Sequence, residues 1–252
     1  MANHKSERAR EGLAGRNGAV LLLSGLVAVA WVVTVERMHG MDAGPGTDLG
    51  GLGWYLGIWV TMTVAMMLPS EAPATFLIAR LRRGLPTVLF LAGYLAVWTV
   101  YGVAAYGLFR LATSFDTGWL AWDGGGPFVA GGVIAAAGIY ELTPVKQLCL
   151  RRCRKPQPEA PAFRSGLVSG LYCVGCSGGL MAVLFALGVM SLVWMVVVAA
   201  VIFAEKVLSY GVLFSRVLAP VLVAVGIWVA LSPSTVPWLT EPGMSPTMQS
   251  RS

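Results

Sequence analysis

The four cysteines of the chain form two pairs at helical spacing, which makes them candidate metal ligands. Cys173 and Cys176 are three residues apart, and Cys149 and Cys153 are four apart. Residues three or four apart lie on one face of a helix, so each pair can point two sulfurs in one direction. Thiolate sulfur is a soft ligand that selects Cu(I) and also suits Zn(II). The cysteines therefore predict a soft-metal site, with copper as the first expectation and zinc as the alternative.

Methionines add thioether sulfurs at two places, and thioethers also favour Cu(I). The first place is a cluster at helical spacing, consisting of Met62, Met66 and Met67. The second is a short segment that also carries an imidazole, consisting of Met38, His39 and Met41. We expect the first group to contribute to a site among helices and the second to capture the ion outside them. Packing without metal is the alternative for both groups.

Ionisable side chains within apolar stretches are further candidates, because charged groups are costly inside a bilayer and usually face a bundle interior or cavity. Glu71, Glu141, Glu205 and Lys206 occupy such positions. The two glutamates Glu141 and Glu205 are candidate ligands. Glu205 and Lys206 are a candidate charge pair, but neighbours on a helix do not face each other, so each is expected to pair with a different helix.

The composition predicts the elements that must position these groups. Hydrophobic residues make up 56% of the 252 residues and charged residues 12%, about half the charge of an ordinary soluble domain. Seven apolar blocks are candidates for helices that cross a bilayer. They are Ala19–Val35, Trp54–Ile78, Val88–Ala112, Phe128–Leu148, Gly166–Leu187, Leu192–Phe214 and Val217–Leu231. The sequence thus predicts an all-α polytopic transmembrane bundle of about seven helices.

Two of these blocks are irregular. Pro69 and Pro73 lie inside the second block and predict a kink or a short second helix there. The block Val217–Leu231 has 15 residues, slightly fewer than the ~17 needed to span, and could lie in the interface.

The basic residues predict an orientation. With a cytoplasmic amino terminus, fourteen Lys and Arg residues fall on the cytoplasmic side and three outside, which satisfies the positive-inside rule. Lys146 is counted among the fourteen, in the connection between the fourth and fifth helices. The prediction is a multi-pass bacterial inner-membrane protein with the amino terminus inside and the carboxyl terminus outside. Its parts are a basic terminus (1–18), a helical domain (19–231) and a flexible tail (232–252). The basic charge indicates topology and contact with lipid, not with nucleic acid.

The first helix has a second interpretation. Ala28-Val29-Ala30 fits a signal-peptidase site. The apolar run continues through Trp31–Val35 without a polar break, which favours an uncleaved anchor.

This topology places the candidate ligands at similar depths. At ~1.5 Å per residue across a ~30 Å core, Cys173, Cys176, Glu141, Glu205 and Met66 lie about 10–15 Å from the cytoplasmic face. Equal depth permits one shared site.

Three ordered blocks of sequence resemble a bacterial family of predicted metal-binding integral membrane proteins of unknown function. They are WVTMTVAMMLPS (59–70), then GIYELTPVK (138–146) with Cys149, Leu150, Cys153 and Arg154, and finally GLYCVGC (170–176) with the positions up to Glu205 and Lys206. The resemblance covers residues 54 to 214.

The resemblance implies that metal binding involves the methionines and cysteines of these blocks together with Glu205. It adds Met181, Met190 and Met195 to the candidates. Three positions depart from the family pattern. Ser177 and Gly178 replace a cysteine and a tryptophan, and Glu141 replaces a glutamine. The ligands are therefore not expected to be identical throughout the family.

The first functional hypothesis is a non-enzymatic protein that binds a soft metal ion and moves it or hands it over, with a metallochaperone or a membrane complex as partner. No nucleotide-binding motif is visible in the sequence. A non-catalytic subunit or assembly factor of a membrane complex is the alternative. A membrane thiol-disulfide oxidoreductase is a second alternative, disfavoured because the predicted topology puts Cys149 and Cys153 in the reducing cytoplasm.

Overall fold

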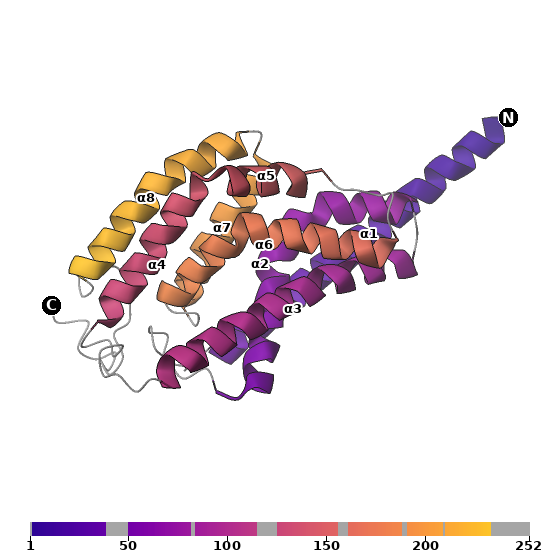
Figure 1. Ribbon diagram of the computed structural model, residues 1–252. Coiled ribbons are helices and arrows are strands. Elements are labelled where there is room, and N and C mark those ends of the chain that lie inside the picture. The colour runs from indigo at the N-terminus through magenta and orange to yellow at the C-terminus, as the bar shows by residue number, and fades with distance from the viewer. Residues whose placement is uncertain are drawn as a thin grey trace, which may run out of the picture.

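The computed structural model describes residues 2–38, 50–81, 84–114, 125–155, 161–187, 191–208 and 210–232. Within these ranges all regular structure is helical (Figure 1). The eight helices are α1 (Ala2–Met38), α2 (Leu52–Leu81), α3 (Leu85–Ser114), α4 (Gly126–Glu141), α5 (Pro144–Cys153), α6 (Ala162–Leu187), α7 (Leu192–Val207) and α8 (Gly211–Leu231). The all-α prediction is therefore confirmed. His39, Met41, Met190 and the tail from residue 233 lie outside the described residues, as does the side chain of Met38.

Five helices are long and apolar enough to cross a membrane. They are α1 within Val20–Arg37, α2, α3, α6 and α8, and the bent pair α4–α5 adds a sixth if it is taken as one span. The remaining helix, α7, has 16 residues, just below the ~17 usually needed to span. Large apolar side chains such as Leu108 and Leu213 face outward from these helices.

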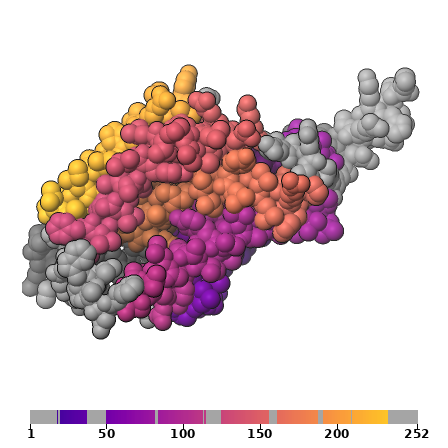
Figure 2. Space-filling model, in the orientation of Figure 1, coloured from indigo at the N-terminus to yellow at the C-terminus, as the bar shows by residue number. Residues whose placement is uncertain are grey.

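The helices α3 and α6 form a parallel pair. An added Cβ at Gly93 would collide with the backbone of Phe163, and one at Gly166 with the backbone of Phe90. Further along, the Tyr101 hydroxyl donates to the carbonyl of Gly178 over 2.9 Å. The two helices thus run in the same direction. The chain that connects them must therefore return to the side of the molecule on which α3 begins. Figure 2 shows α6 at the surface between α3 and the α4–α5 segment.

Two neighbouring pairs of helices, α4 with α8 and α2 with α3, are antiparallel. Gly131 of α4 lies against Gly226 of α8, and Gly138 lies against Ala219. Small residues at such contacts let two helix backbones approach closely. On the other side, the Trp59 indole of α2 donates to the Trp98 carbonyl of α3 over 2.8 Å. Every one of these contacts is carried by glycine or by an aromatic side chain.

The predicted fourth helix, Phe128–Leu148, is in fact two helices. The helix α4 ends at Glu141 and α5 begins at Pro144, with a bend of 69° between them. Thr143 caps the new helix by accepting from the backbone N–H of Lys146 over 3.3 Å. Proline has no N–H to continue α4 but fits the first turn of a helix. The prediction of one continuous helix was therefore wrong.

The predicted boundary between the last two helices was also wrong. The helix α7 ends at Val207, where Leu208 is extended, and α8 begins at Gly211 rather than Val217. Gly211 sits against the Glu205 carbonyl so closely that no Cβ fits, and the Arg154 guanidinium donates to the Leu208 carbonyl. The helix α8 gains length from this shift and reaches 21 residues, enough to span.

The two prolines of α2 do not divide it. The helix is assigned continuously from Leu52 to Leu81 with Pro69 and Pro73 inside. Ser70 and Thr75 donate their hydroxyls to the carbonyls of Met67 and Glu71 in the same helix. The carbonyls that lose a donor to the two prolines are those of Ala65 and Pro69, four residues earlier. Proline is tolerated in membrane helices where neighbouring groups compensate for such losses.

The close contact of α3 and α6 gives a direct test of the fold. We expect Gly93→Ala to destabilise the protein by about 1–3 kcal/mol, because its methyl group would push the two backbones apart. Gly107→Ala on the same helix is the matched control, since nothing lies within 4 Å of its added Cβ. Thermal unfolding in detergent should show a lower melting temperature for the first variant only. Equal melting temperatures would contradict the close approach.

Candidate metal centre

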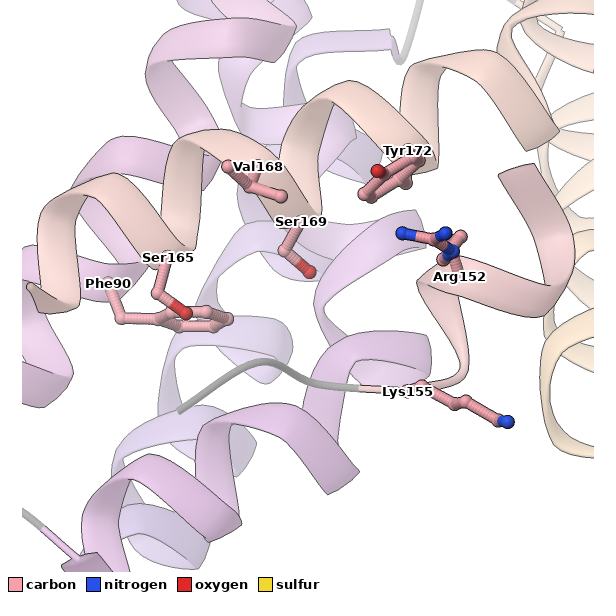
Figure 3. Close-up of a pocket in the computed structure, with 7 residues that line it drawn as sticks. All are labelled: Phe90, Arg152, Lys155, Ser165, Val168, Ser169 and Tyr172. Carbon is pink, nitrogen blue, oxygen red and sulfur yellow. The ribbon is translucent and has the colours of Figure 1, made fainter. Parts of the chain in front are cut away.

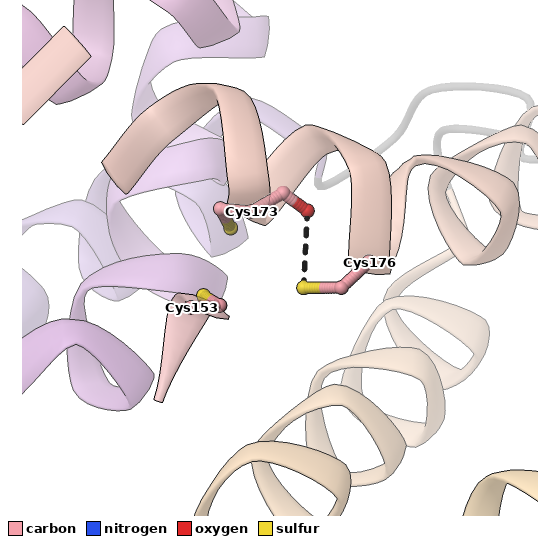
Figure 4. A group of neighbouring side chains, drawn as sticks. All are labelled: Cys153, Cys173 and Cys176. Carbon is pink, nitrogen blue, oxygen red and sulfur yellow. Dashed lines mark hydrogen bonds between the residues drawn. The ribbon is translucent and has the colours of Figure 1, made fainter. Parts of the chain in front are cut away.

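Three of the four thiols meet in the interior. Cys173 and Cys176 of α6 and Cys153 at the end of α5 have sulfurs that all lie within 4.8 Å of one another, and all three residues are buried (Figure 4). A thiolate–metal bond of ~2.3 Å, the value for zinc, places three trigonal thiolates about 4 Å apart. Small side-chain movements would therefore bring the three sulfurs onto one ion.

Local sequence explains how the thiols come together. The three-residue spacing puts Cys173 and Cys176 on one face of α6. The bend before Pro144 turns α5 across that face, so its last residue, Cys153, completes the group. Cys149, one turn earlier, has its sulfur against Gly175 of α6 and is not part of the group of three. A side chain at Gly175 would collide with the Cys149 sulfur, so this glycine permits the approach of α5.

Two polar groups lie within hydrogen-bond distance of the sulfur of Cys173. The ammonium of Lys206 on α7 donates to it over 2.9 Å, and the Tyr94 hydroxyl of α3 is also 2.9 Å away. Cys176 points its thiol at the Cys173 carbonyl over 3.3 Å. A cation that donates to sulfur favours the thiolate, which is the form that binds metal. The geometry therefore assigns Cys173 as the first thiolate of the centre.

A carboxylate also lies beside the cysteines. Glu71 of α2 accepts from the Cys153 thiol over 3.4 Å, from Ser169 over 3.1 Å and from Lys206 over 3.4 Å. Lys206 also donates to Ser70 over 3.0 Å. Glu71 can therefore receive the proton that Cys153 must release when it binds a cation. Helices α2, α3, α5, α6 and α7 all contribute to this network.

The predicted methionines are buried around this centre. Met62, Met66 and Met67 of α2, Met181 of α6 and Met195 of α7 belong to the same core cluster as the three cysteines, each at most 2% exposed. Methionine thioethers are soft and adaptable, so these side chains stay candidate ligands. Among the His, Cys, Asp and Glu side chains of the described residues, the compact group of donor atoms consists of the three cysteine sulfurs.

The predicted glutamate ligands lie in a second buried cluster instead. Lys146 donates to Glu141 over 2.7 Å and to Glu205 over 2.9 Å. Ser215 of α8 donates to the other oxygen of Glu141 over 2.5 Å. Glu205 therefore pairs with α5, whereas its neighbour Lys206 pairs with α2. The structure does not bring Glu141 or Glu205 into the thiol group.

Lys146 corrects the charge count made from the sequence. The sequence predicts that Lys146 lies in a cytoplasmic connection, but its side chain is fully buried between two carboxylates. The sequence carries a signal for this, because Thr143-Pro144 marks a helix start and places Lys146 in its first turn. Sequence analysis also missed Tyr94 and Ser169, which have no spacing signal because each lies on a different turn or helix from the residues it contacts.

Comparison with known protein families connects this chain with copper handling. The model of a protein family described as "PpoB2: Copper chaperone" matches residues 56–229, which include all three cysteines and both buried carboxylate clusters. Neither the curated proteins nor the solved structures contain a match. The chain belongs to the PpoB2 copper chaperone family.

Proposed function

We propose that this protein binds one Cu(I) ion at Cys153, Cys173 and Cys176 and hands it to a partner protein, without catalysing a reaction. The observation that carries the proposal is the group of three buried thiols within 4.8 Å of one another, with Lys206 donating to one sulfur. Thiolate sulfur selects soft ions such as Cu(I). The family match supports copper as that ion.

Charge balance supports the binding step. The ammonium of Lys206 offsets the negative charge of the thiolate at Cys173. Cys153 donates its thiol proton toward Glu71, so a Cu(I) that replaces this proton leaves Glu71 protonated. The interior gains the single positive charge of the ion, which offsets the negative charge that the Glu71 carboxylate carried before. The protein thus binds copper by exchanging it for protons that have a nearby acceptor.

The membrane setting belongs to the same proposal. We place the bundle in a bacterial inner membrane with its amino terminus inside. The parallel arrangement of α3 and α6 fits this topology, because the α4–α5 pair lies between them and returns the chain to the cytoplasmic side. The antiparallel contact of α4 with α8 also fits this topology, in which these two helices cross the membrane in opposite directions.

The test is copper reconstitution of the full chain in detergent under oxygen-free, reducing conditions. We expect about one copper per chain by elemental analysis and a first shell of sulfur by X-ray absorption. Zinc bound in place of Cu(I) at the same site would change the metal but keep the centre. No stoichiometric metal, together with a stable co-purifying protein, would overturn the proposal in favour of a structural subunit of a membrane complex.

Lys206 gives a second test of the centre. Hydrogen bonds to charged groups contribute about 1.5–3 kcal/mol, so we expect Lys206→Met to weaken Cu(I) binding about 10–100-fold. Arg216→Met is the control, because it removes one exposed positive charge from α8. Competition with a chromogenic Cu(I) chelator measures both affinities. Equal affinities of the two variants would show that Lys206 does not stabilise a bound thiolate.

A further inference from the structure

Glu141, Lys146 and Glu205 form a buried carboxylate cluster that the copper centre does not use. Lys146 donates to Glu141 over 2.7 Å and to Glu205 over 2.9 Å, and the three side chains are at most 1% exposed. If both carboxyl groups were ionised, the single ammonium would leave one negative charge uncompensated in an apolar interior. An uncompensated buried charge is costly, and a titratable group in that position tends to become neutral instead. The cluster therefore needs one more positive charge.

The neighbouring cations do not supply that charge. Lys206, the next residue after Glu205, donates to groups of α2 and α6. Arg154 donates to the carbonyl of the residue that follows α7. Arg152 and Lys155 are exposed and border a small pocket at the surface (Figure 3). In the described part of the chain, the ammonium of the cluster is therefore the only cation that forms an ion pair with either of its carboxylates.

The hydrogen bonds of the cluster indicate where a further positive charge belongs. Both carboxylate oxygens of Glu141 accept, one from Lys146 and the other from Ser215 over 2.5 Å. Glu205 accepts from Lys146 through Oε2, whereas its Oε1 is buried and has no partner among the described residues. The side-chain oxygen of Gln147 is buried without a partner as well. Both unpartnered atoms are acceptors, so the cluster lacks a donor. A proton on Oε1 of Glu205 supplies a donor and a positive charge together.

Two helices connect this cluster with the copper centre. The helix α5 carries Lys146 in its first turn and Cys153 at its last residue. On α7, Glu205 precedes Lys206, whose ammonium donates to the sulfur of Cys173 over 2.9 Å. A Cu(I) ion at the thiols adds one positive charge to this interior, and a nearby positive charge favours the ionised form of a carboxyl group. Copper binding and proton binding are therefore opposed at these two sites.

We infer that Glu205 is a proton-binding site, whose Oε1 carries a proton while the copper centre is empty and releases it to solvent when Cu(I) binds. Copper remains Cu(I) in this step. The positive charge of the ion replaces that of the proton, and the ionised Glu205 stays paired with Lys146. Because linkage is reciprocal, ionisation of Glu205 in turn raises the affinity for copper. The release step rests on the proposed function, whereas the proton in the copper-free protein does not.

The first test is infrared spectroscopy of the copper-free full chain in detergent. A protonated carboxyl group in an apolar site has a C=O stretching band separate from the bands of carboxylates and amides. We expect a band in the wild type that Glu205→Gln lacks. Glu205→Asp keeps a carboxyl group and should shift the band. Glu141→Asp is the matched control in the same cluster and should leave the band at its wild-type frequency, since Glu141 accepts at both oxygens.

The second test adds one equivalent of Cu(I) to the same samples. The Glu205 band of the wild type should disappear, and a pH indicator in weak buffer should report about one more proton released per copper than in Glu205→Gln. The band that Glu71 gains on accepting the proton of Cys153 should appear in both proteins. Glu36→Gln, which changes an exposed carboxyl group of α1, should behave as the wild type does.

The outcomes separate this inference from the proposed function. Identical copper-free spectra of the wild type and Glu205→Gln would overturn the inference, and a band that shifts in Glu141→Asp instead would assign the proton to the wrong carboxyl group. A melting temperature that Na⁺ but not K⁺ raises in the wild type alone would identify a sodium ion as the occupant, which also overturns it. A band unchanged by bound copper would overturn the release step. Failure of the wild type to bind copper would sink the proposed function and leave the copper-free spectra as the test of the proton site.

Folding of the variants is checked by thermal unfolding in detergent. Glutamine resembles a protonated glutamate in size, and its carbonyl can still accept from Lys146, so Glu205→Gln should melt close to the wild type. If it does not fold, the shifted band of Glu205→Asp gives the same assignment, and an unshifted band would contradict it.

Discussion

Cys173→Ser is expected to reduce Cu(I) affinity by at least ~100-fold, more than the 10–100-fold typical of changes beyond the direct ligands. The reason is that Cys173 is both the sulfur nearest the Lys206 ammonium and a member of the group of three. A serine oxygen is a hard donor and cannot replace a thiolate for a soft ion. Competition with a chromogenic chelator measures the affinity, and elemental analysis measures the copper content.

Cys149→Ser is the matched control for this experiment. Cys149 lies one turn from Cys153 on the same helix, but its sulfur rests against Gly175, outside the group of three. We expect this variant to keep one copper per chain with an affinity within about threefold of wild type, since it retains all three proposed ligands. If Cys149→Ser loses copper and Cys173→Ser keeps it, the centre is assigned to the wrong thiols.

Lys146→Met is expected to destabilise the protein by about 3–5 kcal/mol, because it leaves buried carboxylates without their cation. Lys146 is fully buried and bonds to Glu141 over 2.7 Å and Glu205 over 2.9 Å. These bonds join α4, α5 and α7, so their loss should loosen the bend that carries Cys153. Thermal unfolding in detergent, followed with a thiol-reactive dye, measures the effect through exposure of the buried cysteines.

Two further variants test the cause of the stability loss expected for Lys146→Met. Lys155→Met removes an exposed lysine just beyond α5 and should leave the melting temperature unchanged. The triple variant Lys146→Met/Glu141→Gln/Glu205→Gln removes the unpaired charges and should recover most of the loss. A single variant no less stable than Lys155→Met would show that the cluster is not a buried ion network. Failure of the triple variant to recover would assign the loss to packing.

Local features of the sequence were sufficient for the helices and for one half of the centre. A long apolar block must be helical inside a membrane, because only a helix satisfies every backbone group within one segment. The shared face of Cys173 and Cys176 follows from helical periodicity alone. These properties depend on residues within a turn or two, so they could be predicted without knowing the fold.

Helix ends could be predicted less well. The end of α7 depends on Arg154, the residue after α5, whose guanidinium donates to the Leu208 carbonyl 54 positions further along the chain. It also depends on a local contact, the fit of Gly211 against the Glu205 carbonyl six positions earlier. The bend before α5 had a local signal in Thr143-Pro144, but an apolar block that continues to Leu148 concealed it. Contacts made by residues more than fifty positions apart leave no trace in the spacing of either partner.

The sequence by itself determined that this is a helical bundle with apolar walls, and that two thiols share one face of α6. The tertiary structure decided which groups complete the site. It selected Cys153 rather than Cys149 as the third thiol, placed Glu71 and Lys206 beside the sulfurs, and removed Glu141 and Glu205 by pairing them with Lys146. The physical reason is that depth and helical face are local properties, whereas the partner of a buried charge is set by the crossing of α5 over α6 and by the helices packed around it.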